Sequence, residues 1–250
     1  MLPQNWIECF SIRLNPLYIA QPEKPIMSDK VVYTAIFGQK DELKEFDSFE
    51  GIDRILFTDD PNIKSDQFEI RVVPPIFEDP VLNARYYKIL AHRVLSDYQY
   101  SLWIDASIAF NGVDPNHLFD KYLKNHDIAL HLHPERNCLY DEATACIRLE
   151  KDDPDVINAQ ISSYANHGFP KNQGLISSGI MFRRSSERCK HLNEAWWDEI
   201  RRFSRRDQIS FPFVRHKLDF SFYPIPGHVR LNNVTGFKFK GHLKPDFRNW

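Results

Sequence analysis

The sequence lacks the two commonest glycine-rich loops that bind nucleotide phosphates. It has only nine glycines against 16 prolines, and neither Gly-x-Gly-x-x-Gly nor Gly-x-x-x-x-Gly-Lys occurs along its 250 residues. Those loops cradle phosphates with closely approaching backbone N–H groups. If the protein binds a nucleotide, other groups must hold the phosphates.

Cysteines and long apolar runs are also scarce. The four cysteines are scattered without a C-x-x-C pair, which predicts reduced thiols in a cytoplasmic protein. No stretch approaches the roughly twenty apolar residues that span a bilayer. The N-terminus has no basic region followed by an apolar run. We therefore expect no transmembrane segment, and at most a peripheral association with the inner face of a membrane.

Neither sign of charge is in excess. The chain has 32 Lys and Arg against 34 Asp and Glu, for a net charge of −2, and this balance argues against a dedicated nucleic-acid binder. A composition of 42% hydrophobic and 26% charged residues is typical of a globular protein. Its length favours one large domain, so we expect an irregular, proline-containing arm over residues 1–29 and a single domain over 30–250.

From Lys30 onwards, apolar runs typical of buried strands alternate with stretches of helical composition. Strands are expected at 31–37, 54–58, 68–73, 100–104, 127–132 and 175–182. Helices are expected at 40–49, 81–96, 115–124, 139–149, 154–165, 185–203 and 207–217. This order predicts an α/β fold with a mostly parallel central sheet flanked by helices, followed by a less regular tail from Phe220.

One carboxylate follows a strongly apolar strand. Asp105 comes directly after Tyr100–Ile104, and the carboxyl ends of parallel strands are where ligands bind in open α/β sheets. No Lys or Arg neighbours it in sequence, so it could bind a divalent cation together with diphosphate oxygens. The alternative is a strand-end residue that only caps the following turn.

The expected helix 81–96 combines a core stripe with a cationic edge. Its apolar residues Leu82, Tyr86, Leu90 and Val94 recur at four-residue steps. Its basic residues Arg85, Lys88 and His92 fall within one narrow arc. Such an edge could clamp phosphates, or it could be a solvated face with its aliphatic stems on the core.

Three further groups of polar residues stand out. Strand alternation puts His131 and His133 on one side, where they could bind a metal or, with the polar residues that follow, sugar hydroxyls. Asp207 opens an expected helix as an N-cap or as an acid-base group. The basic tail 238–245 could reach a diphosphate or remain solvated.

Taken together, these segments resemble the glycosyltransferase-like domain of plant mucilage-synthesis proteins and their bacterial counterparts. The segments that carry the resemblance are Thr34–Gly38, Phe57–Asp59, Asn83–Lys88, Trp103–Ile108, His133 with Cys138–Glu142, Gly174–Gly179 and Arg206–Gln208. They span about residues 30–215. The resemblance implies a GT-A-like, Rossmann-like fold and a glycosyltransferase that uses a nucleotide-diphosphate sugar.

The resemblance also assigns roles to individual residues. Implied donor-binding residues are Thr34, Phe37, Asp59, Arg85, Lys88, Asp105, Ser107, His242 and Lys244. Implied sugar- or acceptor-binding residues are His133, Arg136, Tyr140, Asp141, Glu142, Ser178 and Gly179. Implied catalytic residues are Asp207, Arg206 and Gln208, with Asp207 as a base or an orienting carboxylate.

A metal is implied by the position of Asp105, which matches the first residue of the family's Asp-x-Asp motif. Ser107 stands at the second position, so Mn²⁺ or Mg²⁺ would be held by Asp105 and Ser107 with help from His242 or His228. The cation would neutralise the leaving nucleoside diphosphate.

The expected function is therefore metal-assisted sugar transfer to a cell-surface or capsular polysaccharide or to a glycolipid. Similarity of the tail Gly241–Pro245 to that of some retaining enzymes favours retention. Two alternatives stay open: a metal-dependent hydrolase, because hydrolytic activity is attached to a plant member of the family, and a catalytically silent nucleotide- or sugar-binding module.

Overall fold

The computed structural model describes residues 28–44, 47, 49–110, 114–229 and 236–240. The strands are β1 Lys30–Ile36, β2 Asp53–Thr58, β3 Glu69–Val72, β4 Tyr100–Ile104, β5 Ile108–Phe110, β6 Ile128–Leu132, β7 Ile176–Arg184, β8 Tyr223–Ile225 and β9 Phe237–Phe239. The helices are α1 Pro80–Ile89, α2 Ala91–Val94, α3 Asn116–Leu123, α4 Leu139–Arg148, α5 Pro154–Asn166, α6 Glu187–Arg202 and α7 Asp207–Lys217. The predicted arm lies outside the described residues up to position 27.

Seven of these strands form one central sheet in the order β3-β2-β1-β4-β7-β6-β8, while β5 and β9 form a separate pair. The pairs β1–β2, β1–β4, β2–β3 and β6–β8 are parallel, and β7 runs antiparallel to both of its neighbours. The predicted α/β class with a mostly parallel sheet flanked by helices is confirmed. Parallel neighbours bring the carboxyl ends of β1, β2 and β4 to one edge of the sheet.

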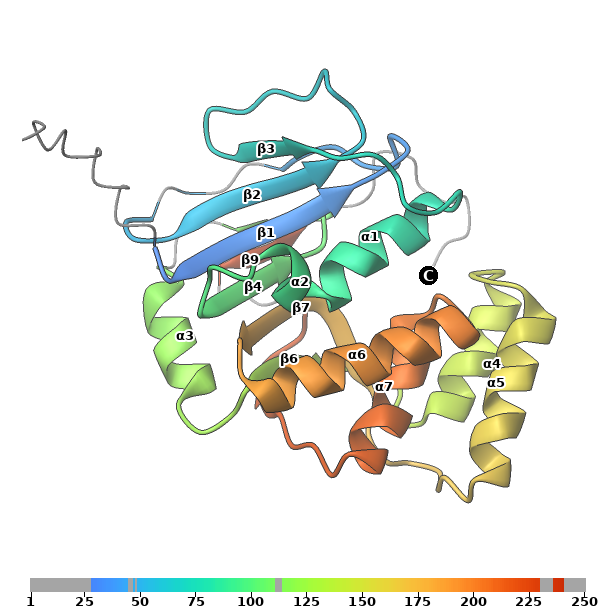
Figure 1. Cartoon of the computed structure of the whole chain (residues 1–250). Helices are drawn as coiled ribbons and strands as arrows, with labels where there is room; N and C mark the ends of the chain where they lie inside the picture. The colour runs from blue at the N-terminus through green and yellow to red at the C-terminus, as the bar shows by residue number, and fades with distance from the viewer. Residues whose placement is uncertain (1–27, 45–46, 48, 111–113, 230–235, 241–250) are drawn as a thin grey trace, which may run out of the picture.

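Apolar side chains cover both faces of this sheet, as its unbroken apolar strands predict. One face carries Val31, Tyr33 and Trp103 and packs against α1, α2 and α6. The opposite face carries Val32, Ile36 and Leu102 and packs against α3 and β9. Figure 1 shows α1 and α6 in front of the sheet and α3 at the left of the view.

A third apolar cluster lies beyond the end of the sheet, where α4 and α5 pack against α7 (Figure 1). Side chains cap the starts of α5 and α6. Asp153 accepts a hydrogen bond from the backbone N–H of Asp155 at the start of α5, and Ser186 accepts one from Cys189 at the start of α6. Because α7 also contacts β7, this cluster adjoins the central sheet.

The helix expected at residues 40–49 is absent from its described residues. The backbone N–H of Asp47 instead donates to the carbonyl of Phe110, and the ring of Phe49 packs on that of Phe110 with centroids 5.2 Å apart. Leu43 and Phe49 both pack against the sheet-face cluster. This segment therefore forms tertiary contacts with β5 in place of the helix that its composition predicted.

The helix expected at 81–96 is broken at Leu90, which has φ −94° and ψ 39°. The guanidinium of Arg183 donates to the carbonyl oxygens of Ile89 at 3.0 Å and Lys88 at 2.6 Å, so β7 satisfies the end of α1. The predicted stripe still faces the core, since Leu90 is buried and Leu82, Tyr86 and Val94 pack against the same cluster. Tyr87, Lys88 and Ile89 at the end of α1 are buried as well.

The short strands β5, β8 and β9 were not predicted, since three residues are too few to show an alternating pattern. In the C-terminal part of the chain, β8 extends the central sheet beside β6, and β9 pairs with β5. In the part of the chain that the structure describes, no helix is both long and apolar enough to span a bilayer.

Candidate active site

Asp105 lies directly after the carboxyl end of β4, as the sequence predicted. Its Oδ1 atom accepts a hydrogen bond from Trp103 Nε1 at 2.7 Å, since residues two apart in an extended chain point the same way. Its side chain is 33% exposed. Asp105 therefore combines a fixed orientation with access to solvent.

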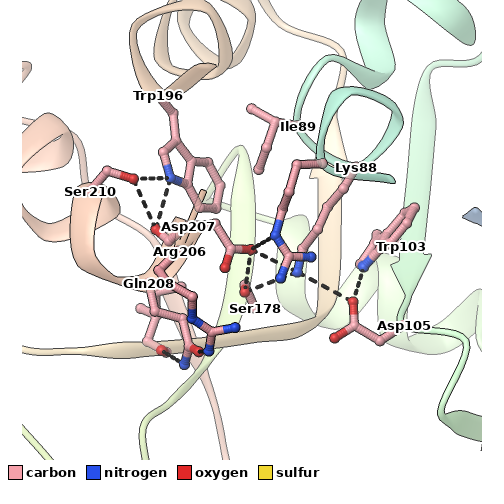
Figure 2. Close-up of polar contacts among 12 residues, drawn as sticks. Lys88, Ile89, Trp103, Asp105, Ser178, Trp196, Arg206, Asp207, Gln208 and Ser210 are labelled. Atoms are coloured by element: carbon pink, nitrogen blue, oxygen red, sulfur yellow. Dashed lines mark hydrogen bonds and ion pairs between the residues drawn. The ribbon is translucent and has the colours of Figure 1, made fainter. Parts of the chain in front are cut away.

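Lys88, from α1, joins Asp105 to a second carboxylate (Figure 2). Its Nζ atom lies 2.8 Å from Oδ2 of Asp207 and 3.3 Å from Oδ1 of Asp105, and it donates to the hydroxyl of Ser178 at 3.0 Å. These three acceptors match the three N–H donors of an ammonium group. The Lys88 side chain is 1% exposed, and its predicted contact with the donor stays a prediction.

Asp207 is the first residue of α7 and is as buried as Lys88. Burial alone would raise the pKa of Asp207, but the charges of Arg85 and Lys88 and the hydrogen bond from Lys88 hold it well below its usual range. The hydroxyl of Ser178 donates to the same carboxylate at 2.8 Å. Asp207 is thus held in its ionised form, with Arg85, Lys88 and Ser178 all on its Oδ2 atom.

Gly179 makes room for Asp105. A Cβ atom at this position would lie 3.2 Å from Oδ2 of Asp105 and 3.2 Å from Cδ1 of Ile108. The backbone N–H of Asp105 also donates to the carbonyl of Gly179 at 2.8 Å. Gly179 therefore borders the carboxylate of Asp105, and Ser178 beside it belongs to the Lys88 cluster.

Two arginines flank Asp207 from different elements. Nε of Arg85 lies 3.5 Å from Oδ2 of Asp207, and this side chain is 15% exposed. Arg206 precedes α7 and interacts electrostatically with both Asp207 and Glu142. The amide of Gln208 donates to the carbonyl of Ile176 at 2.8 Å and so ties the start of α7 to β7.

The predicted acceptor segment meets this cluster through Glu142. Its carboxylate is buried and accepts from Nε of Arg136 at 2.6 Å, and Nε2 of His133 lies 3.8 Å away. The charge of Arg206 interacts with the carboxylates of both Glu142 and Asp207. Sequence spacing gave no sign of this link, because more than sixty residues separate the two carboxylates.

Other predicted site residues have structural roles. Thr34 and Phe37 are buried, and the ring of Phe37 stacks on that of Tyr87 with centroids 5.3 Å apart. Asp59 accepts from the backbone N–H of Gly38 at 3.0 and 3.1 Å and so joins the ends of β1 and β2. The predicted donor contacts of Thr34, Phe37 and Asp59 stay predictions.

The remaining part of the predicted acceptor set is dispersed. The hydroxyl of Tyr140 donates to the carbonyl of Phe169 at 2.7 Å, within the helical cluster, and Asp141 is exposed on α4.

The three basic residues of the expected helix 81–96 do not stay together. His92 lies after the end of α1 and pairs with Glu194 at 2.7 Å, away from Arg85 and Lys88. Arg85 and Lys88 therefore both approach Asp207, whereas His92 does not.

The described residues do not by themselves fit the implied metal. Oδ1 of Asp105 already accepts from Trp103 and Lys88, and Ser107 is buried. No group of three His, Cys, Asp or Glu side chains within the described ranges could hold a metal ion. His242 and Lys244 lie outside the described residues, so their roles stay predictions.

The His131–His133 pair does not form a metal site either. A bulge between Leu130 and His131 shifts the pairing of β6 with β7, and His133 lies beyond the strand end. Nδ1 of His131 faces the carbonyl of Gly227 at 3.3 Å, whereas Nδ1 of His133 accepts from the backbone N–H of Arg136 at 3.0 Å. The two rings therefore serve different local networks.

Comparisons with known proteins relate this geometry to a family. The model of the TOD1/MUCI70 glycosyltransferase-like domain matches residues 68–232, which include β4, β7 and the start of α7. The chain is 30% identical over 152 residues to the probable hexosyltransferase MUCI70 and 28% identical over 155 residues to the alkaline ceramidase TOD1, both from Arabidopsis thaliana. These matches cover 57% and 58% of this chain, but only 26% and 33% of the two relatives.

Solved structures that resemble the chain include two glycosyltransferases. The mannosyltransferase Ktr4p from S. cerevisiae has a TM-score of 0.39 and 10% identity, with 76% of this chain and 66% of that chain covered. Mouse xyloside xylosyltransferase 1 has a TM-score of 0.39 and 11% identity, with 79% of this chain and 84% of that chain covered. Scores this low carry no argument about function.

The family match confirms the resemblance that the sequence motifs indicated, including the strand end at Asp105 and the segment Cys138–Glu142, both of which lie inside the matched range. It covers well over half of the chain. The chain belongs to the TOD1/MUCI70 glycosyltransferase-like domain family.

Proposed function

We propose that this domain transfers a sugar from a nucleotide-diphosphate donor to a polysaccharide or glycolipid acceptor. The observation that carries the proposal is the cluster at the carboxyl edge of the sheet, in which Lys88 holds Asp105 and Asp207 together. Family membership and the hexosyltransferase name of one relative support the same reaction class. A cytoplasmic location, with at most peripheral membrane contact, stays a prediction.

The cluster suits the charges that develop during glycosyl transfer. The departing diphosphate gains negative charge, and the sugar becomes oxocarbenium-like and gains positive charge. Arg85 is the cationic side chain of the cluster with an exposed fraction, so we assign it to the diphosphate. Asp105 is the exposed carboxylate, so we assign it to the donor, while Lys88 and Ser178 keep that carboxylate and Asp207 in place.

The buried state of Asp207 bears on stereochemistry. A carboxylate with a strongly lowered pKa is a weak base, so Asp207 is poorly suited to deprotonate an acceptor hydroxyl. If no side chain takes that proton, a departing phosphate oxygen can take it on the same face of the sugar, and the anomeric configuration is retained. We therefore propose a retaining transfer in which Asp207 orients and stabilises.

A hydrolase is the second candidate, because one relative carries the name alkaline ceramidase. In that case water would replace the sugar hydroxyl as the nucleophile near Asp105 and His133. The same assay distinguishes the two reactions, since a hydrolase releases a free product without needing a carbohydrate acceptor.

The proposal is tested with purified protein, a panel of nucleotide sugars and a set of oligosaccharide and glycolipid acceptors, each with and without Mn²⁺ or Mg²⁺. We expect release of a nucleoside diphosphate that depends on the acceptor and falls at least about tenfold in Asp105→Asn. Asp198→Asn, which neutralises an exposed carboxylate on α6, is the matched control. Cleavage of a ceramide substrate without nucleotide-sugar turnover would support the second candidate instead.

A further inference from the structure

Arg183 is a buried cation without a carboxylate partner. Its side chain lies inside the molecule on β7, with 2% of the residue exposed, and its terminal nitrogens donate to the carbonyls of Lys88 and Ile89 and to the hydroxyl of Tyr33. Within the described ranges, no Asp or Glu forms an ion pair with it. Buried charges are normally paired, because an isolated one is costly to desolvate.

The neighbouring acidic groups do not neutralise this charge. Burial raises the pKa of the Tyr33 hydroxyl to about 12, although Arg183 acts to lower it. Burial likewise raises the pKa of the Cys189 thiol to about 12. Both groups are therefore neutral near pH 7 and do not offset the charge of the guanidinium.

A hollow of about 20 Å³ lies beside this guanidinium, between α2, β7 and α6. Four buried polar atoms of its lining residues have no hydrogen-bond partner: Nε of Arg183, Nε of Arg184, Nδ1 of His92 and Oδ1 of Asn193. The lining also includes Arg184 and Lys190 and contains no Asp or Glu. The residues around the hollow thus carry positive charge, and four of their buried polar atoms have no partner.

Its size limits the occupant. A volume of this order holds about one water-sized particle, so a phosphate or a nucleotide does not fit. The amide of Asn193 can turn its NH₂ group towards an anion, and Nε of Arg183 is an obligate donor. We propose that the hollow binds a monatomic anion, chloride under physiological conditions, as the counter-ion of Arg183.

This anion would act on the candidate active site through α1. Arg183 holds the carbonyl of Lys88 at the break after α1, and the side chain of Lys88 joins Asp105 to Asp207. A counter-ion that stabilises the Arg183 guanidinium therefore stabilises the helix end that presents Lys88. The ligand is structural and is separate from the donor and the acceptor.

Thermal unfolding of the full chain tests the proposal. Sodium chloride or bromide is titrated against sodium gluconate at constant ionic strength, so that general screening is unchanged. We expect the halide to raise Tm by about 2–4 °C and the rise to saturate, as for a ligand that binds only the folded state.

The variant Asn193→Asp places a carboxylate beside the hollow and so replaces the charge of the proposed anion. This variant should have a higher Tm in gluconate than the wild type and should lose the halide response. Asn158→Asp, which adds the same charge at an exposed position of α5, should keep the wild-type response. An unchanged halide response in Asn193→Asp, or none in the wild type, would overturn the proposal.

Bromide-soaked crystals of the wild type give a test that needs no variant. The anomalous signal of bromide should appear within hydrogen-bond distance of Nε of Arg183. A water with no anomalous signal at this position would mean that His92 and Asn193 accept from a solvent molecule, and the anion site would be rejected.

Discussion

The ammonium of Lys88 lies 2.8 Å from the carboxylate of Asp207, and each side chain is only 1% exposed. One group comes from the end of α1 and the other from the first residue of α7. A pair this deeply buried stabilises the fold only while both partners are present, because either charge alone would remain desolvated. The pair therefore links the integrity of the candidate site to the packing of α1 against α7.

Asp207→Asn should leave the buried Lys88 ammonium without its nearest counter-charge. We expect the free energy of unfolding to fall by about 3–5 kcal/mol, with loss of transfer activity. Chemical denaturation followed by circular dichroism measures the first effect. The exposed control Asp198→Asn should change it by less than about 0.5 kcal/mol, and an equally small effect in Asp207→Asn would contradict the buried pair.

Ser178→Ala removes one acceptor of Lys88 and one donor to Asp207. We expect a smaller loss of about 1–3 kcal/mol, because the ion pair remains but two hydrogen bonds are lost. Ser185→Ala, in the loop before α6, is a serine control outside the cluster. A double-mutant comparison of Ser178→Ala with Asp207→Asn should give less than the sum of the single effects.

Gly179→Ala tests whether the space beside Asp105 matters for function. The new Cβ would lie 3.2 Å from the carboxylate oxygen and from Ile108, so the side chain of Asp105 has to move by a few tenths of an ångström. We expect transfer activity to fall by at least about tenfold with only a modest change in Tm. Wild-type activity in a folded Gly179→Ala protein would show that the position of Asp105 is not critical.

His131 should make the protein less stable in mild acid. Burial lowers the pKa of His131 from the ordinary 6.5 to about 4. The hydrogen bond with the Gly227 carbonyl acts in the opposite direction but is the smaller effect. Between these two pH values the unfolded chain binds a proton that the folded protein does not, so stability falls as the pH drops through this window, by up to about 3 kcal/mol.

His131→Gln should flatten that dependence between about pH 6.5 and 4, because glutamine does not titrate. Denaturation midpoints measured across the window provide the comparison. His191→Gln, at an exposed position of α6, should keep the wild-type slope. An identical slope in His131→Gln would mean that other groups cause the acid sensitivity.

The sequence predicted those parts of the structure that depend on local pattern. The bounds of α7 were predicted as 207–217, and Asp105 was placed at a strand end, because both predictions rest on local composition. The predicted N-cap role of Asp207 was wrong, since Arg206 is the N-cap and no side chain caps this helix. Trp103, which orients Asp105, could also have been recognised from its spacing of two residues along the strand.

Features that depend on distant residues were not predicted. Arg183, more than ninety residues away in sequence, satisfies the end of α1 and explains the break at Leu90. The helix expected at 40–49 was wrong because Phe110 supplies its backbone and ring contacts. Likewise, the spacing of Arg85, Lys88 and His92 could not show that Lys88 is buried among acceptors while His92 pairs with Glu194.

Calorimetric titration of the wild type with uridine, guanosine, adenosine and cytidine diphosphates, with and without Mn²⁺, tests the central proposal most directly. We predict that at least one nucleoside diphosphate binds and that Asp105→Asn weakens its affinity by at least about tenfold, while Asp198→Asn does not. Dependence of this binding on Mn²⁺ would also decide whether Asp105 acts with residues such as His242 to hold a metal. Absence of binding by all four diphosphates under both conditions would contradict the assignment of this site to a nucleotide-sugar glycosyltransferase.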